Sequence, residues 1–246
     1  MYNSFAYVYD LFMDGTPYEK WASNLERLFK RFKLSPKLIL DLGCGTGGVT
    51  IPMSRRGYEM IGVDISVDML NIAREKAAAS ELDILYLNQD MRSFELYGTV
   101  DACISVCDSM NYILNPAGLK KVFKLVKNYL NPGGYFIFDL NTLYFFRQLA
   151  SRGSFGEIRE NCAFICETGY SEKRRVMEYC VDVFVQNGDI YNRFSEVHFE
   201  RAYAMDEIVP LIEQSGLNFR GVYDAKTLKA ISAESERVYV CCCKST

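Results

Sequence analysis

The residues best suited to bind a small ligand form a glycine-rich loop between two apolar segments. Leu38–Leu42 is apolar apart from Asp41 and leads into Gly43-Cys44-Gly45-Thr46-Gly47-Gly48, and the next apolar run ends at Asp64. A strand that enters a glycine turn ahead of a helical pattern is typical of sites that hold an adenosine-containing ligand against a helix N-terminus. In such sites an acidic residue at the end of the second strand, here Asp64, binds the ribose.

The loop matches two patterns, and the charge of Asp41 distinguishes between them. Gly43, Gly45 and Gly48 match G-x-G-x-x-G of dinucleotide-binding enzymes, whereas the segment from Asp41 to Gly47 matches Asp-x-Gly-x-Gly-x-Gly. A carboxylate at the mouth of the loop repels a pyrophosphate but attracts S-adenosylmethionine, which carries a sulfonium and an ammonium group. Asp41 therefore favours the sulfonium ligand. A glycine turn in which Asp41 is only a cap is the alternative.

Composition excludes several other classes of protein. The chain has 246 residues, 49% hydrophobic and 24% charged, which is ordinary for one large soluble domain or one domain with an insertion. A net charge of −3 provides no general attraction for nucleic acid or an anionic membrane. Nine cysteines without a C-x-x-C pair, and a single histidine, predict reduced thiols in a cytoplasmic protein and no metal site. No signal pattern and no membrane-spanning apolar run is present.

Strand and helix patterns alternate around the loop. Apolar spacing predicts helices over 18–32, 46–56, 66–79 and 119–130, and strands over 37–42, 59–63, 84–87, 100–106 and 135–138. We expect Pro132-Gly133-Gly134 to break the chain before the last of these strands. Alternation of this kind predicts an α/β fold with a doubly wound, mostly parallel sheet and helices on both faces.

The pattern changes to period two from about residue 153. It predicts antiparallel strands over 163–168, 176–186 and 190–201, with a type I′ turn at Asn187-Gly188, and then a helix over 205–215 and strands over 217–223 and 237–243. An insertion of this size is too small to bury a good core of its own. We therefore expect a core formed by residues 1–150 and 204–246, and an inserted antiparallel β cap, 151–203, over the active-site crevice.

With these features the chain resembles the class I S-adenosylmethionine-dependent methyltransferases. It is most similar to small bacterial members with an N-terminal Tyr-x-x-Phe-Ala-x-x-Tyr-Asp pattern, which is found here from Tyr2 to Asp10 and is followed by Pro17-Tyr18 and Trp21. The insertion is loosely similar to the β caps of sugar and glycine N-methyltransferases. The resemblance implies a seven-stranded sheet whose last strand is antiparallel, with S-adenosyl-L-methionine bound at the carboxyl ends of the strands.

The resemblance also implies which residues contact the cofactor. Those at its methionyl part would be Asp41, Gly43, Cys44, Gly45 and, through a backbone carbonyl, Cys107. Those at its ribose and adenine would be Asp64, Ile65, Met69, Asp90 and Met91. Two aromatic residues would close over it from the N-terminal segment, Tyr9 and Trp21. Simple core packing is the alternative for Met69, Tyr9 and Trp21.

Methyl transfer from a sulfonium is a direct displacement, so the protein mainly aligns the acceptor with the methyl carbon. A neutral amine needs little further help, whereas a hydroxyl or carboxyl acceptor needs a base. Our candidate catalytic residues are Tyr9, Asn111 and His198, and Tyr112 and Asn141 are further polar groups near the expected site. His198 shares one face of its strand with Glu196 and Glu200. We expect this mixed face to line a polar cavity or to meet water.

The sequence thus predicts a methyltransferase that acts on a nitrogen or oxygen of a small molecule. The alternatives are a methyltransferase for RNA or protein, an NAD(P)-dependent oxidoreductase, and a non-catalytic cofactor binder. Cys107-Asp108-Ser109-Met110 stands where groups that methylate adenine or glutamine nitrogens have Asn/Asp-Pro-Pro-Tyr. Because the chain also lacks a basic groove, a nucleic acid partner is disfavoured, and no membrane partner is expected.

Overall fold

The computed structural model of the chain describes residues 5–246, and its core is a seven-stranded sheet in the order β10-β11-β5-β4-β1-β2-β3. The strands are β1 (Leu38–Leu42), β2 (Glu59–Asp64), β3 (Ile84–Asn88), β4 (Val100–Ser105), β5 (Leu130–Asn141), β10 (Asn218–Asp224) and β11 (Arg237–Cys243). The pairs among β1 to β5 are parallel, whereas β11 is antiparallel to both of its neighbours. The predicted doubly wound sheet with an antiparallel last strand is confirmed.

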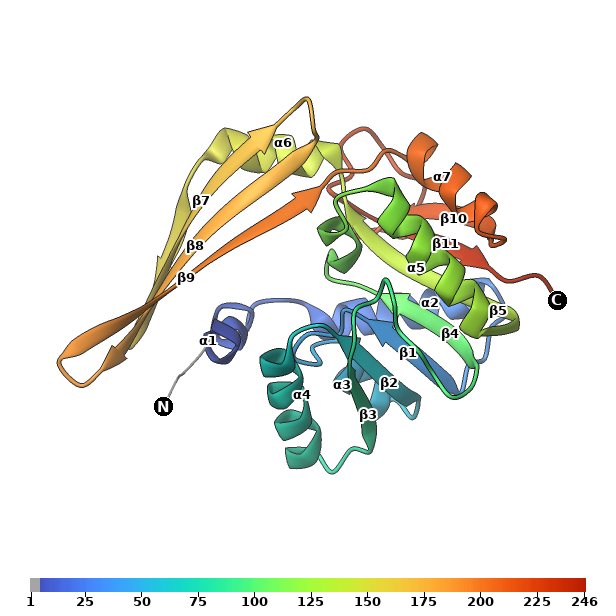
Figure 1. Cartoon of the computed structure of the whole chain (residues 1–246), viewed down its shortest axis with the longest axis horizontal. Helices are drawn as coiled ribbons and strands as arrows, with labels where there is room; N and C mark the ends of the chain where they lie inside the picture. The colour runs from blue at the N-terminus through green and yellow to red at the C-terminus, as the bar shows by residue number, and fades with distance from the viewer. Residues whose placement is uncertain (1–4) are drawn as a thin grey trace.

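Helices cover both faces of this sheet (Figure 1). They are α2 (Tyr18–Arg31), α3 (Thr50–Arg55), α4 (Val67–Ala79), α5 (Pro116–Tyr129) and α7 (Met205–Gln214). Successive residues of a strand point to opposite faces, so Ile39 packs in one apolar cluster with α2 and α3, and Leu40 packs in another with α5 and α7. The carboxyl ends of β1, β2 and β4 are thereby held at one edge of a rigid core.

A second, antiparallel sheet has the order β6-β7-β8-β9. Its strands are β6 (Phe155–Ile158), β7 (Cys162–Ser171), β8 (Val176–Asn187) and β9 (Ile190–Arg201). Figure 1 shows it as a long twisted arm that extends from the core, with α6 (Leu143–Arg152) beside it. The short helix α1 (Phe5–Phe12) lies between this arm and α4, and Val8 packs with Cys162 and Val183 of the arm.

Several predicted elements differ in extent from the observed ones, and two of these differences have a clear structural cause. Strand β5 already begins at Leu130, because its register against β4 shifts between Val100 and Ala102 and this bulge absorbs the Pro-Gly-Gly segment. The helix expected from residue 46 begins only at Thr50, since Gly47 has φ +79°, which a right-handed helix does not allow. Among residues 5–246, no helix has the length and apolar character needed to cross a membrane.

Candidate active site

The glycine-rich turn is fixed at the carboxyl edge of the core sheet. The backbone N–H groups of Gly43 and Cys44 donate to the Val63 carbonyl at 2.8 and 3.1 Å. Gly43 has φ +74°, and a Cβ there would lie 2.6 Å from the Cβ of Ser109, so only glycine fits this position. Ser109 in turn donates its hydroxyl to the Gly43 carbonyl at 3.1 Å. The turn therefore has a defined shape, set by β2 and by the 3₁₀ turn η1 (Ser109–Tyr112).

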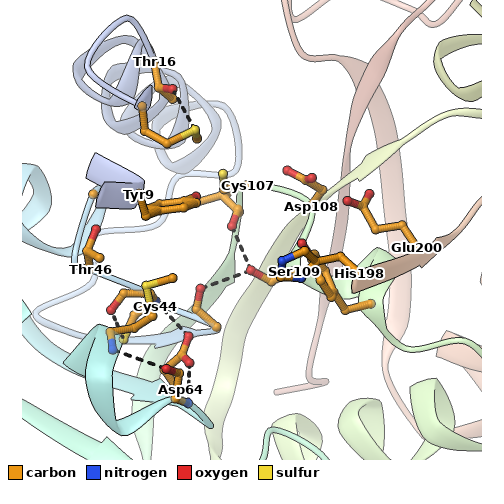
Figure 2. Close-up of a pocket in the computed structure, with 18 of the residues that line it drawn as sticks. Tyr9, Thr16, Cys44, Thr46, Asp64, Cys107, Asp108, Ser109, His198 and Glu200 are labelled. Carbon is orange, nitrogen blue, oxygen red and sulfur yellow. Dashed lines mark hydrogen bonds between the residues drawn. The ribbon is translucent and has the colours of Figure 1, made fainter. Parts of the chain in front are cut away.

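Asp64 is oriented toward this turn. Its carboxylate accepts hydrogen bonds from the backbone N–H groups of Gly45 and Ser66, both at 2.8 Å (Figure 2). Burial raises the pKa of Asp64, and these hydrogen bonds oppose that rise. A Cβ on Gly45 would have no atom within 4 Å, so the turn borders open space beside Asp64. The ribose contact expected of Asp64 stays a prediction.

The sequence suggested that Asp41 lies at the mouth of the loop. The structure instead places Asp41 within β1, where the residue is 2% exposed. Its carboxylate accepts a 2.6 Å hydrogen bond from the Thr50 hydroxyl. Burial raises the pKa of Asp41 to about 7; the Thr50 hydrogen bond opposes this rise, and the charges of Asp64 and Asp139 add to it. Since Asp41 still lines the cavity described below, a cationic ligand there would stabilise its ionised form.

A cavity of about 1080 Å³ extends from the glycine turn to the inner face of the arm. Figure 2 shows Cys44, Thr46 and Asp64 on one side of it and Asp108, His198 and Glu200 on the other. The volume exceeds the range of about 300–1,000 Å³ typical of a site for one small ligand. The lining includes all twelve residues assigned to the cofactor: Tyr9, Trp21, Asp41, Gly43, Cys44, Gly45, Asp64, Ile65, Met69, Asp90, Met91 and Cys107.

The residues assigned to the adenine lie at one rim of the cavity. Ile65 is 68% exposed, and Met69 follows Ser66, whose hydroxyl caps α4 by accepting from the Met69 N–H at 3.3 Å. Arg92 donates through Nε to both carboxylate oxygens of Asp90, at 2.9 and 3.0 Å, and this pairing lowers the pKa of Asp90. The adenine contact predicted for Asp90 therefore has to share the carboxylate with Arg92.

Helix α1 closes the cavity from the N-terminal side. The Asp10 carboxylate accepts from the Thr46 hydroxyl at 2.6 Å and pairs with Lys76 of α4 at 2.9 Å. These contacts hold Tyr9 in the lining, and burial raises the pKa of its hydroxyl well above the ordinary value. Of the N-terminal sequence motif, residues 2–4 (Tyr2, Asn3 and Ser4) lie outside the described part of the chain.

The sequence did not reveal an ion-pair network that includes two residues of the cavity lining, Asp108 and Arg237. Arg237 of β11 pairs with Asp108 at 2.9 Å and with the fully buried Asp139 of β5 at 2.7 Å. Asp139 also accepts from the backbone N–H groups of Cys107 and Asp108, which both have positive φ angles. Three distant segments meet here, so no local spacing could have indicated the network. It holds the Cys107 backbone in an otherwise unfavourable conformation.

Asn111 does not lie in the cavity, which corrects our placement of it among the catalytic candidates. Its side chain is fully buried and has its hydrogen bonds elsewhere. The amide donates to the carbonyls of Asn141 and Arg201 at 3.2 and 2.8 Å, and its oxygen accepts from the Asn141 N–H at 3.0 Å. Asn111 thus connects β5 to β9. The other candidates, Tyr9, Tyr112, Asn141 and His198, do line the cavity.

The inner face of β9 contributes the polar groups of the arm. His198 Nε2 lies 3.0 Å from Glu196 Oε2, and the His198 ring meets the Tyr112 ring edge-on at 6.0 Å. Glu200 is only 4% exposed and accepts a 3.4 Å hydrogen bond from Asn141. Burial, and next the nearby Asp108 charge, raise the pKa of Glu200 well above the ordinary value. We did not select Glu200 from the sequence, although the strand alternation that placed it beside His198 was the available signal.

Comparisons with known proteins agree with this geometry. A family profile described as "Methyltransferase domain" matches residues 39–134. "Putative methyltransferase YqeM" of Bacillus subtilis (strain 168) is 32% identical over 97% of this chain and 95% of its own. The crystal structure of an S-adenosylmethionine-dependent methyltransferase from Clostridium acetobutylicum ATCC 824 superposes with a TM-score of 0.87, at 29% identity and 98% coverage of both chains. A Streptomyces venezuelae "dTDP-3-amino-3,4,6-trideoxy-alpha-D-glucopyranose N,N-dimethyltransferase" is 29% identical over 54% of this chain and 55% of its own.

The doubly wound sheet, its glycine turn and Asp64 define a fold of the type that binds adenosine-containing ligands, and the relatives identify the class of enzyme. The chain belongs to the class I S-adenosylmethionine-dependent methyltransferases. Its cofactor is S-adenosyl-L-methionine, which supplies a methyl group activated by the sulfonium. The residues present fit this group, because Asp41 and Asp64 both line the cavity and a Cβ on Gly45 would meet no atom within 4 Å.

Proposed function

We propose that the protein transfers the methyl group of S-adenosyl-L-methionine, by direct displacement, to a nitrogen or oxygen of a small molecule. The observation that carries this proposal is the continuity of the cavity, which joins the glycine turn to the inner face of the arm. Such a space holds the cofactor and an acceptor together and excludes much of the solvent. The name of the Streptomyces venezuelae relative, an N,N-dimethyltransferase of an amino sugar nucleotide, supports a small acceptor.

In this proposal the chain divides as the sequence pattern indicated. Residues 1–150 and 204–246 bind the cofactor, and 151–203 act as the cap that encloses the acceptor. Asp64 binds the ribose hydroxyls, and Tyr9 and Trp21 close over the cofactor. For an oxygen acceptor, His198 with Glu196 at 3.0 Å is a suitable base.

The acidic lining of the cavity also argues against RNA as the acceptor. Nine free thiols support a location in the reducing cytoplasm.

The test is transfer of labelled methyl from S-adenosylmethionine into a size-fractionated cell extract. The proposal expects label in the small-molecule fraction. Label in protein or RNA would contradict it, and saturable cofactor binding without any transfer would indicate a binder rather than an enzyme. The variant Asp64→Asn should lose both binding and transfer, whereas Asp83→Asn, which removes an exposed carboxylate outside the cavity lining, should retain both.

A further inference from the structure

The cavity lining is strongly acidic for its size. It contains seven carboxylate side chains and two arginines, and the carboxylates are Asp41, Asp64, Asp68, Asp90, Asp108, Glu196 and Glu200. Both arginines already have carboxylate partners, since Arg92 pairs with Asp90 and Arg237 bridges Asp108 and Asp139. Among the residues that the structure describes, no lysine or arginine of the lining is therefore left without a carboxylate partner to neutralise an anionic acceptor. A carboxylate or phosphate brought into this space would be repelled.

The acidic groups and the apolar groups occupy different parts of the acceptor side. Asp108 lies near enough to Glu200 for its charge to raise the pKa of Glu200, and the half-buried His198–Glu196 pair lies along the same strand face as Glu200. The apolar part comes from α6 and from the inner face of the arm, with Phe145, Leu149, Phe164, Tyr179, Val181 and Val183. A ligand that satisfies both parts has one cationic group and an apolar body.

We infer that the methyl acceptor is an amine carried on an apolar body, and that Glu200 binds its ammonium group and takes the proton from it. This inference rests on the proposed function, because it assigns the acceptor of the same cavity. Glu200 lies on β9 opposite Asp108, so the two carboxyl groups border the same space from the arm and from the core (Figure 2). The Asn141 amide holds the Glu200 carboxyl toward that space.

When the ammonium form of the acceptor binds beside Glu200, the proton on the Glu200 carboxyl leaves to solvent. One N–H proton then passes to the Glu200 carboxylate and frees the nitrogen lone pair. The lone pair forms the new C–N bond as the S–CH₃ bond breaks, and the electron pair of that bond stays on sulfur as a neutral thioether. The positive charge ends on the methylated nitrogen, and Glu200 loses its proton to solvent before the next cycle.

The first experiment measures binding without turnover. The protein is saturated with S-adenosylhomocysteine, and its melting temperature is recorded with hexylamine, benzylamine and 2-phenylethylamine, each beside the alcohol and the carboxylic acid of the same skeleton. The inference expects the amines to raise the melting temperature more than either analogue. It is overturned if the alcohols or acids stabilise the protein as much as the amines, or if no amine stabilises it.

The second experiment separates a proton acceptor from a structural residue. In Glu200→Gln, amine binding should weaken about tenfold or more, as expected on loss of a charge-assisted hydrogen bond, while S-adenosylhomocysteine affinity stays within about twofold. The control Glu178→Gln changes an exposed carboxylate on the outer face of the same sheet and should alter neither. Unchanged amine binding in Glu200→Gln would overturn the assignment.

The pH dependence of methyl transfer is measured with the amine that stabilises the protein most. A purely structural role of Glu200 would not alter this pH dependence. With Glu200 present, kcat/KM should rise with pH as this carboxyl ionises, and the rise should disappear in Glu200→Gln. The groups that face it are Asp108, Tyr112, Asn141, Tyr179, Glu196, His198 and Arg237. An identical profile in both proteins would refute the proton-transfer role. If the protein binds S-adenosylhomocysteine but methylates only macromolecules in extract, the proposed function fails instead.

Discussion

Replacing the buried Asp41 by asparagine should stabilise the cofactor-free protein, and increasingly so as the pH rises. Burial raises the pKa of Asp41 from 3.8 to about 7, so the folded state binds more protons than the unfolded state between these values. The contribution of the protonated group to stability is complete below the unfolded pKa and is lost as pH rises through about 7. Between pH 5 and pH 8 the loss amounts to about 3 kcal/mol.

Asparagine has the same shape and can still accept the hydrogen bond from Thr50, so the substitution removes the charge alone. The free energy of unfolding of Asp41→Asn relative to the unsubstituted protein should therefore grow by about 3 kcal/mol from pH 5 to pH 8. The same substitution should weaken S-adenosylmethionine binding about tenfold or more at pH 8, because a buried carboxylate no longer offsets the cationic ligand. Stability and cofactor affinity thus change in opposite directions.

The assay is urea denaturation of the cofactor-free protein at several pH values, with calorimetry for the cofactor. The control is Asp101→Asn, which also removes one carboxylate but from a site where burial is outweighed by hydrogen bonds from Lys37 and Leu38, so that the pKa is lowered. The free energy of unfolding of Asp101→Asn relative to the unsubstituted protein should not change between pH 5 and pH 8. The electrostatic argument is refuted if the stability difference of Asp41→Asn is also independent of pH over this range, or if the variant binds the cofactor with unchanged affinity.

Three further substitutions test the site and its support. Asp64→Asn should weaken S-adenosylmethionine binding at least about tenfold by calorimetry, and full affinity would exclude a ribose contact. Arg237→Met should destabilise the protein by about 3–5 kcal/mol in urea, since it leaves two carboxylates of the network without their cation, and a loss under about 1 kcal/mol would show the network to be unimportant. Gly62→Ala places a Cβ 2.6 Å from the Tyr86 ring and should lower the free energy of unfolding by about 1–3 kcal/mol in the same assay. The control is Gly98→Ala, whose Cβ would have no atom within 4 Å, and it should be nearly neutral.

Sequence reasoning succeeded where the deciding interactions are local or periodic. The alternation of apolar runs predicted a doubly wound sheet, because a strand buried on both faces leaves a near-continuous apolar signature. The helix predicted over 66–79 is found as α4 with Ser66 as its cap, since a cap needs only a side chain three residues before the N–H it binds. The extent of β5 could not be predicted, because the bulge that absorbs Pro132 depends on pairing with β4.

By itself the sequence determined the sheet, the glycine turn and the position of Asp64 at the end of β2, and the acidic Asp41 beside the turn indicated a cationic cofactor. The turn, Asp41 and Asp64 lie in one consecutive strand–turn–helix–strand segment, and the parallel pairing of β1 with β2 brings Asp64 next to Gly45. Only the tertiary structure decided that Asp41 is buried with its pKa near neutrality, that Asn111 connects two strands, and that Glu200 meets Asp108. Burial and charge pairing arise between segments far apart in the chain, so no local pattern encodes them.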